Sequence, residues 1–303
     1  MTVPRSAVQR PEVVAAATLA VDARWPAASV WLWRLSTFLL SMAALTALAC
    51  AWDGRQPGYS SVWSKPLKFQ LALAVHAATL AWALPCLAPT LRRVAMPPVL
   101  LALWSGVALY EAFYITLQGA RGVASHFNRA TPWESVAASL MAAGAGVLVS
   151  VTFWVGAVAL WQVVRGGDSV GEREASPSGR GGSGQASFAR LLQPDFPLAP
   201  LAIGLGFTLG AVLAAWSGSA MGAARGYWPQ PLQEPVFWMP LTGWVLSQTD
   251  LRLAHFIGLH QMQLLPVLAA AAAWAGWRPG ATRFALGIAS VAAVIAVGWL
   301  QRP

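Results

Sequence analysis

Seven apolar stretches recur along the sequence, each about as long as a helix that crosses a bilayer core of roughly 30 Å. In hydrocarbon every backbone N–H and C=O must be satisfied within the protein, and a helix achieves this within a single segment. The sequence therefore predicts an all-α, polytopic transmembrane helix bundle of about seven spans. We expect these spans at residues 28–51, 67–87, 97–118, 136–164, 198–221, 251–275 and 284–300.

The composition supports a lipid environment. Only 10% of the residues are charged and 57% are hydrophobic, whereas soluble domains carry about 25% charged residues. We therefore expect the lipid bilayer to be the main partner of the chain. The net charge of +9 does not indicate a nucleic-acid partner, because the basic residues are scattered singly among the connections instead of forming one basic face.

The domain organisation follows from the spans and one low-complexity segment. Residues 1–27 are expected to be a cytoplasmic N-terminal tail, and residues 28–164 to hold spans one to four. Residues 165–197 are rich in Gly, Ser and charge, which is typical of a flexible cytoplasmic linker. Residues 198–303 then carry spans five to seven.

The basic residues predict the orientation. With the N-terminus in the cytoplasm, 12 of the 20 Lys and Arg residues fall on the cytoplasmic side, a modest positive-inside bias. They are Arg5, Arg10, Arg24, Arg34, Arg92, Arg93, Arg165, Arg173, Arg180, Arg190, Arg278 and Arg283. We therefore predict a bacterial inner-membrane protein with a cytoplasmic N-terminus and a periplasmic C-terminus. Cys50 and Cys86 would then lie near opposite membrane faces, too far apart for a disulfide.

Ionisable residues within spans are candidate functional residues, because each costs about 2.5–3.5 kcal/mol near a helix centre. The sequence has Glu111 in the third span, His76 in the second, and His255 and His260 in the sixth. Counted from the outer helix ends at about 1.5 Å per residue, His76, Glu111 and His260 lie at similar depths. Lys65 and Lys68 are interpreted as interfacial anchors.

Two spans carry polar faces. At about 100° per residue, the sixth span places Arg252, His255, His260 and Gln263 on one broad face, away from Gln261.

In the third span Glu111, Tyr114 and Gln118 form a stripe. Pro266 is expected to kink the sixth span below this zone, and Gly206 and Gly210 to let the fifth span pack closely on another helix.

These faces suggest an outward-facing polar pocket between spans two, three and six that binds a small ligand, haem, a metal ion or a quinone. Its predicted ligand-binding residues are Glu111, Gln118, Arg121, His126, Arg252, His255, His260 and Gln263. Arg121 or Arg252 would clamp an anionic group. A metal would use His76, His255 and His260, and haem the pair His76 and His260. The alternative for each residue is hydrogen-bonded packing without a ligand.

Two other function classes stay open. The same residues would line a pathway in a transporter or channel component. A membrane-embedded hydrolase would place zinc on His126, His255 and His260, with Glu111 or Asp250 as base. The sequence lacks a phosphate loop, a nucleophile elbow and the His-Glu-x-x-His zinc motif, which favours a binding function over an enzymatic one.

Three segments carry a resemblance to other proteins. They are ARGVASHFN at 120–128, DLRLAHFIGLHQMQLLP at 250–266 and WSKPLKF at 63–69. With these segments the chain resembles a group of uncharacterised bacterial multi-pass inner-membrane proteins. The resemblance covers most of the helical region and implies a seven-helix membrane protein, without an activity, a cofactor or established site residues.

Overall fold

The structure is a computed structural model that describes residues 26–56, 60–166, 196, 198–232, 236–239, 242–246 and 249–302. Most of the predicted N-terminal tail and of the predicted linker at 165–197 lies outside the described residues. The described part of the chain is all-α and holds no strand, only an isolated antiparallel bridge between Trp238 and Val245.

The helices follow the predicted spans to within a few residues. They are α2 (Ala27–Trp52), α3 (Ser64–Ala83) with the short η1 (Leu84–Cys86), α4 (Pro89–Ala95), α5 (Pro98–Arg121), α6 (Pro132–Val164), α7 (Ala199–Ala224), α8 (Leu251–Leu259), α9 (Gln261–Trp274) and α10 (Pro279–Leu300). Six helices of the described chain are long and apolar enough to cross a membrane, and the number is seven if α8 and α9, bent by 44° at their junction, form one span. This make-up confirms the all-α bundle and fits a multi-pass membrane protein.

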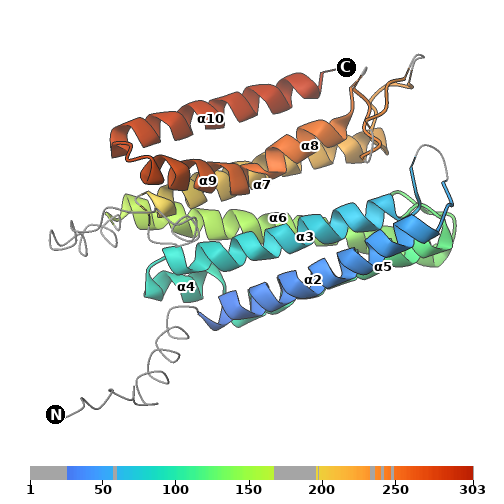
Figure 1. Cartoon of the computed structure of the whole chain (residues 1–303), viewed down its shortest axis with the longest axis horizontal. Coiled ribbons are helices and arrows are strands. Elements are labelled where there is room, and N and C mark those ends of the chain that lie inside the picture. The colour runs from blue at the N-terminus through green and yellow to red at the C-terminus, as the bar shows by residue number, and fades with distance from the viewer. Residues whose placement is uncertain are drawn as a thin grey trace, which may run out of the picture.

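The spans lie roughly side by side along one axis, with α2 and α10 on opposite sides of the bundle (Figure 1). The connections α2–α3, α5–α6 and α7–α8 all lie at one end, which we call the loop end. The start of α2, α4 and the α9–α10 turn lie at the other end, which we call the arginine end. Cys50 is near the loop end and Cys86 near the arginine end, and both are free.

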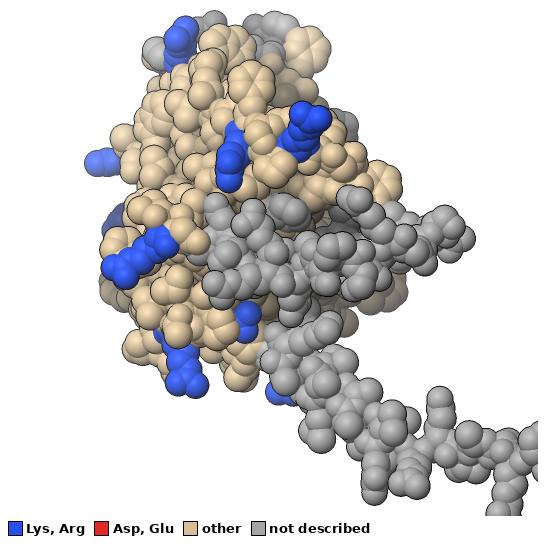
Figure 2. Space-filling model, turned by 90° about the vertical axis from the view of Figure 1, so that its left-hand side faces the viewer, with Lys and Arg blue, Asp and Glu red and all other residues tan. Residues whose placement is uncertain are grey.

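The described residues of the arginine end include basic side chains and no acidic ones. Figure 2 shows this face with several Lys or Arg side chains and no Asp or Glu among the described residues. The described carboxylates are Asp53, Glu111, Glu134 and Asp250, of which three lie in or beside the connections of the loop end and Glu111 lies within α5. Among the described residues, the loop end therefore has both acidic and basic side chains, whereas the arginine end has basic ones.

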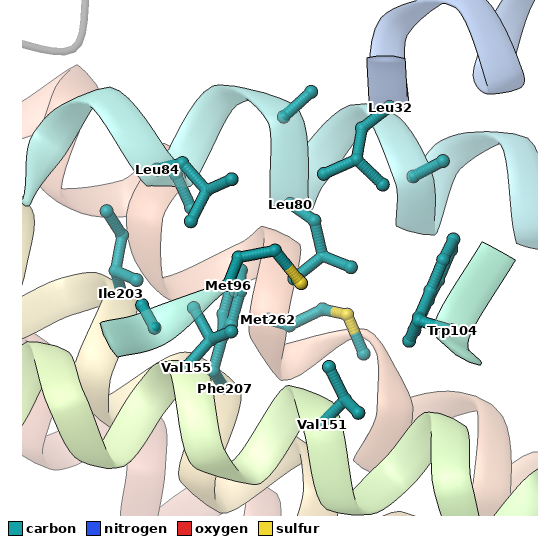
Figure 3. Packing of buried hydrophobic residues seen from close by; sticks show 14 of the residues in the cluster. Leu32, Leu80, Leu84, Met96, Trp104, Val151, Val155, Ile203, Phe207 and Met262 are labelled. Atoms are coloured by element: carbon teal, nitrogen blue, oxygen red, sulfur yellow. The ribbon is translucent and has the colours of Figure 1, made fainter. Parts of the chain in front are cut away.

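Apolar side chains fill the bundle between its middle and the arginine end. Leu80, Met262 and Phe207 belong to a buried cluster with residues from α2, α5 and α6 (Figure 3). Each of these three side chains is at most 1% exposed. Among the described residues, no Asp, Glu, Lys, Arg or His is buried in this half of the bundle.

The break between α8 and α9 comes at His260, near Met262, whose carbonyl lacks a helical partner because Pro266 has no N–H. The bent segment also packs closely against α7. A Cβ atom on Gly206 would lie 2.7 Å from the backbone oxygen of Gln261, and one on Gly258 would lie 2.8 Å from Leu213 Cβ. The bent backbone thus lies directly on α7, which confirms the close approach predicted from Gly206.

Candidate functional site

Two lysines on the first turns of α3 reach across to the segment between α7 and α8. Lys65 Nζ donates to Tyr227 Oη at 3.2 Å and lies 6.0 Å from the centre of the Phe69 ring. Lys68 Nζ donates to the backbone oxygen of Thr242 at 2.6 Å. Both side chains are only partly exposed, and neither forms an ion pair with a described residue. Both lysines therefore bond to the segment between α7 and α8 at the loop end.

Arg252 is held by a carboxylate of its own segment. Asp250 caps α8 and accepts from Arg252 Nε at 2.8 Å, while Arg252 Nη2 donates to Gly243 O at 2.9 Å. The guanidinium also lies 4.6 Å from the Tyr227 ring and 5.5 Å from the Trp228 ring. Burial raises the pKa of the Tyr227 hydroxyl, which keeps it neutral. Arg252 thus joins the start of α8 to Gly243 in the segment before it.

Arg121 is likewise engaged. Its Nη1 atom lies 3.0 Å from Glu134 Oε1 and 2.6 Å from Gln118 Oε1, and its guanidinium lies 4.8 Å from the Trp133 ring. Gln118 Nε2 in turn donates to Tyr114 Oη at 3.2 Å. Arg121 and Gln118, both predicted ligand-binding residues, therefore tie the end of α5 to the start of α6.

His126 folds back onto α3. Its ring lies 5.2 Å from the Phe69 ring, and Nδ1 is hydrogen-bonded to Ser125 Oγ at 3.2 Å. Burial, with smaller effects from the charges of Lys65 and His255, holds the pKa of His126 well below its usual range. The imidazole is therefore neutral at pH 7 and close to both groups. His126, although it lies in a loop, therefore packs against α3 at the loop end of the bundle.

His255 and His260, in the bent span formed by α8 and α9, each form one hydrogen bond from a ring nitrogen to a nearby oxygen. His255 Nδ1 is hydrogen-bonded to Ser217 Oγ of α7 at 3.1 Å. His260 Nδ1 donates to Phe256 O at 2.8 Å, and its ring lies over the Phe256 ring with the centres 3.9 Å apart. Both side chains are half-buried.

His76 lies deeper and is packed. Its Nε2 atom is hydrogen-bonded to Thr152 Oγ1 at 2.8 Å, and its ring meets the edge of Trp104 at 5.0 Å. One turn further on, Gln263 Nε2 of α9 donates to Thr79 Oγ1 of α3 at 3.0 Å. These contacts tie α3 to α6 and α9 at the middle of the bundle.

Glu111 is the most isolated of these groups. It is 3% exposed, and its Oε1 atom has no hydrogen-bond partner among the described residues. Gly144 of α6 leaves room for the carboxyl, since a Cβ atom there would lie 3.2 Å from Oε1. The charge that acts on it is that of Lys65. Glu111 is therefore a buried carboxyl with one oxygen that no described residue satisfies.

The predicted metal and haem sites find no support in these residues. Within the described ranges, no three His, Cys, Asp or Glu residues lie close enough together to hold a metal ion. A haem between His76 and His260 would have to separate α3 from α9, which the Gln263–Thr79 hydrogen bond joins directly. The side chains present therefore do not fit either group.

Sequence reasoning missed Lys65, Phe69 and Tyr227. Lys65 was open to detection, because the chain has only two lysines among 20 basic residues and both enter α3 one turn apart. Tyr227 joins the site only through the fold of the α7–α8 connection. No protein-family model, curated protein or solved structure matches this chain.

Proposed function

We propose that this membrane protein binds a small molecule with one anionic group on an aromatic body, and that Lys65 holds the anionic group. The observation that carries the proposal is the state of Lys65. Its ammonium is half-buried, donates one hydrogen bond to a neutral phenol, Tyr227, and has no ion pair with a described residue. A partly buried charge favours an oppositely charged partner, which an anionic ligand supplies.

The local charge supports a single negative group. Lys65, Lys68 and Arg252 are mutual electrostatic neighbours, and the carboxylates beside them are Glu111 and Asp250. Basic side chains therefore outnumber carboxyl groups by one in this cluster, which favours a ligand with a negative group.

The aromatic rings around Lys65 support a flat, apolar body. The rings of Phe69 and Tyr227 lie 6.0 and 5.9 Å from its ammonium, and Phe127 lies 6.3 Å from Tyr227. Phe127 has φ of +60°, a strained value for a residue with a side chain, of the kind that recurs at ligand sites. Stacking on such rings is worth about 0.5–1.5 kcal/mol for each aromatic pair.

We also propose that the loop end faces the periplasm and the arginine end the cytoplasm of a bacterial inner membrane. Two observations support this orientation. The described residues of the arginine end include no acidic side chain (Figure 2), and the predicted topology places 12 of the 20 Lys and Arg residues on that side.

Binding of benzoate to the full chain in lipid nanodiscs tests the proposal. Benzoate offers a carboxylate for Lys65 and a ring for Phe69 and Tyr227, whereas benzamide has the same shape without the charge. We expect benzoate to bind at least about tenfold more tightly than benzamide, measured by titration calorimetry. We expect Lys65→Met to reduce benzoate affinity to that of benzamide.

The matched control is Arg129→Met, which removes an exposed cation of the same end that makes no contact with the cluster. It should leave the preference for benzoate intact. Equal affinity for benzoate and benzamide, or an unchanged affinity in Lys65→Met, would sink the proposal.

The two other function classes have less support. A transport pathway needs polar groups through both halves of the bundle, and the half toward the arginine end is packed with apolar side chains (Figure 3). A zinc hydrolase needs a group of metal ligands, which the described residues do not form.

A further inference from the structure

An open groove with a volume of about 350 Å³ lies beside the first turns of α6. These turns follow the α5–α6 connection and therefore lie at the loop end (Figure 1). The side chains that line the groove are Arg129, Ser135, Val136, Ser139 and Leu140. None of them contacts Lys65 or Tyr227, so the groove is a second candidate site, separate from the one described above.

The first turns of α6 have a buried face and an exposed face. Glu134, Ala137 and Met141 are at most 8% exposed and point into the bundle. Val136 and Leu140 are 60% and 54% exposed. Because residues four apart share one helix face, these two side chains form an apolar strip that points away from the bundle. On a membrane-spanning helix, such a strip lies against the acyl chains of lipids.

Arg129 is the basic residue of the groove. Its side chain is exposed and forms no hydrogen bond or ion pair with a described residue. The carboxylate closest to it in the sequence, Glu134, is buried on the other face of α6. Glu134 accepts there from Arg121 at 3.0 Å and from Thr131 Oγ1 at 2.9 Å. The guanidinium of Arg129 is therefore available to an anion in the groove.

The two serines of the groove add hydroxyl groups beside this guanidinium. Ser139 Oγ donates its proton to Ser135 O at 2.9 Å, so its oxygen is left as an acceptor. Ser135 Oγ has no hydrogen-bond partner among the described residues, so its proton is available to an acceptor. None of the five lining side chains is acidic. Arg129 and Ser135 together can thus donate to an anionic group with several oxygens.

We propose that this groove binds one anionic phospholipid, with its phosphate on Arg129 and Ser135 and an acyl chain along Val136 and Leu140. The planar guanidinium of arginine matches the geometry of phosphate oxygens. Trp133, which is 46% exposed in the same first turn, is of the residue type that gathers at the headgroup level of membranes. A soluble anion would leave the apolar strip without a partner, so the strip favours a lipid.

Photolabelling of the full chain in nanodiscs tests the proposal, with no other ligand present. The nanodiscs contain a small fraction of phosphatidylglycerol with a diazirine in its acyl chain, or the same fraction of phosphatidylcholine with the same chain. Mass spectrometry identifies the labelled residues. We expect phosphatidylglycerol to label Val136 and Leu140 about fivefold more than phosphatidylcholine does, which is the preference that one basic residue gives for an anionic lipid.

Arg129→Gln should remove this preference, so that the two lipids label Val136 and Leu140 equally. Arg225→Gln is the matched control, because it removes another exposed cation of the loop end, at the end of α7. It should leave the preference intact. Val291 of α10 is 59% exposed and serves as a reference position within the same sample. It should be labelled equally by the two lipids in every variant.

Three results would overturn the proposal. They are equal labelling of Val136 and Leu140 by the two lipids, no labelling at either residue, and an unchanged preference in Arg129→Gln. Loss of the preference in inorganic phosphate at constant ionic strength would also overturn it, because the groove would then be a site for a free anion. These outcomes do not bear on benzoate binding, because the groove shares no residue with the site around Lys65.

Discussion

Asp250→Ala is expected to lower the free energy of unfolding by about 3–5 kcal/mol, because it leaves Arg252 without its carboxylate in a mostly buried position. The side chain of Asp250 is 0% exposed and that of Arg252 is 19% exposed. Asp250 also accepts from the backbone N of Val245 at 2.9 Å, so the segment at residues 242–246 loses this hydrogen bond as well. Thermal unfolding in detergent measures the change.

The chain contains a matched control for this substitution. Asp53 and Arg55 repeat the same local geometry, with Arg55 Nε donating to Asp53 Oδ1 at 2.9 Å. Here the side chains are 23% and 50% exposed, so solvent screens the pair. Asp53→Ala should leave the unfolding midpoint nearly unchanged. Equal losses in the two variants would show that burial does not decide the strength of these pairs.

Gly206→Ala is expected to lower the free energy of unfolding by about 1–3 kcal/mol through overpacking. The new Cβ atom would lie 2.7 Å from the backbone oxygen of Gln261 and 3.2 Å from Pro266 Cδ, so α7 and α9 must separate. The measurement is again the unfolding midpoint in detergent.

Gly287→Ala makes the same change in α10, where nothing lies within 4 Å of the added atom. It should raise the free energy of unfolding by about 0.4–1 kcal/mol, since alanine restricts the unfolded chain. A neutral Gly206→Ala would mean that α7 and the bent span do not need their close approach.

Hydrophobic length was enough to predict the spans, because the requirement for satisfied backbone in lipid leaves few alternatives to a helix. Helical spacing predicted the buried stripe of Glu111, Tyr114 and Gln118, which share one face of α5. Neither kind of pattern contains tertiary packing. The sequence could not predict the close packing of α7 against residues 258–262, because that packing depends on the tertiary fold.

The fold gives some of the basic residues discussed above a carboxylate partner and leaves others without one among the described residues. Arg121 and Arg252 looked like clamps in the sequence, and the structure pairs them with Glu134 and Asp250. Lys65 looked like an interfacial anchor, and the structure places it beside Tyr227 without an ion pair among the described residues. Whether a cation has an ion-pair partner depends on the tertiary fold, so a local sequence pattern cannot predict it.

Acetylation of the lysines in intact spheroplasts measures most directly whether Lys65 holds an anionic group at the outer face. Lys65 and Lys68 are the only lysines of the chain. Mass spectrometry after treatment with a membrane-impermeant acetylating reagent therefore measures the modification of each lysine separately. The expected result is acetylation of Lys65 from outside, reduced by benzoate and unaffected by benzamide. Acetylation of Lys65 only in inverted vesicles, or acetylation that benzoate does not reduce, would contradict it.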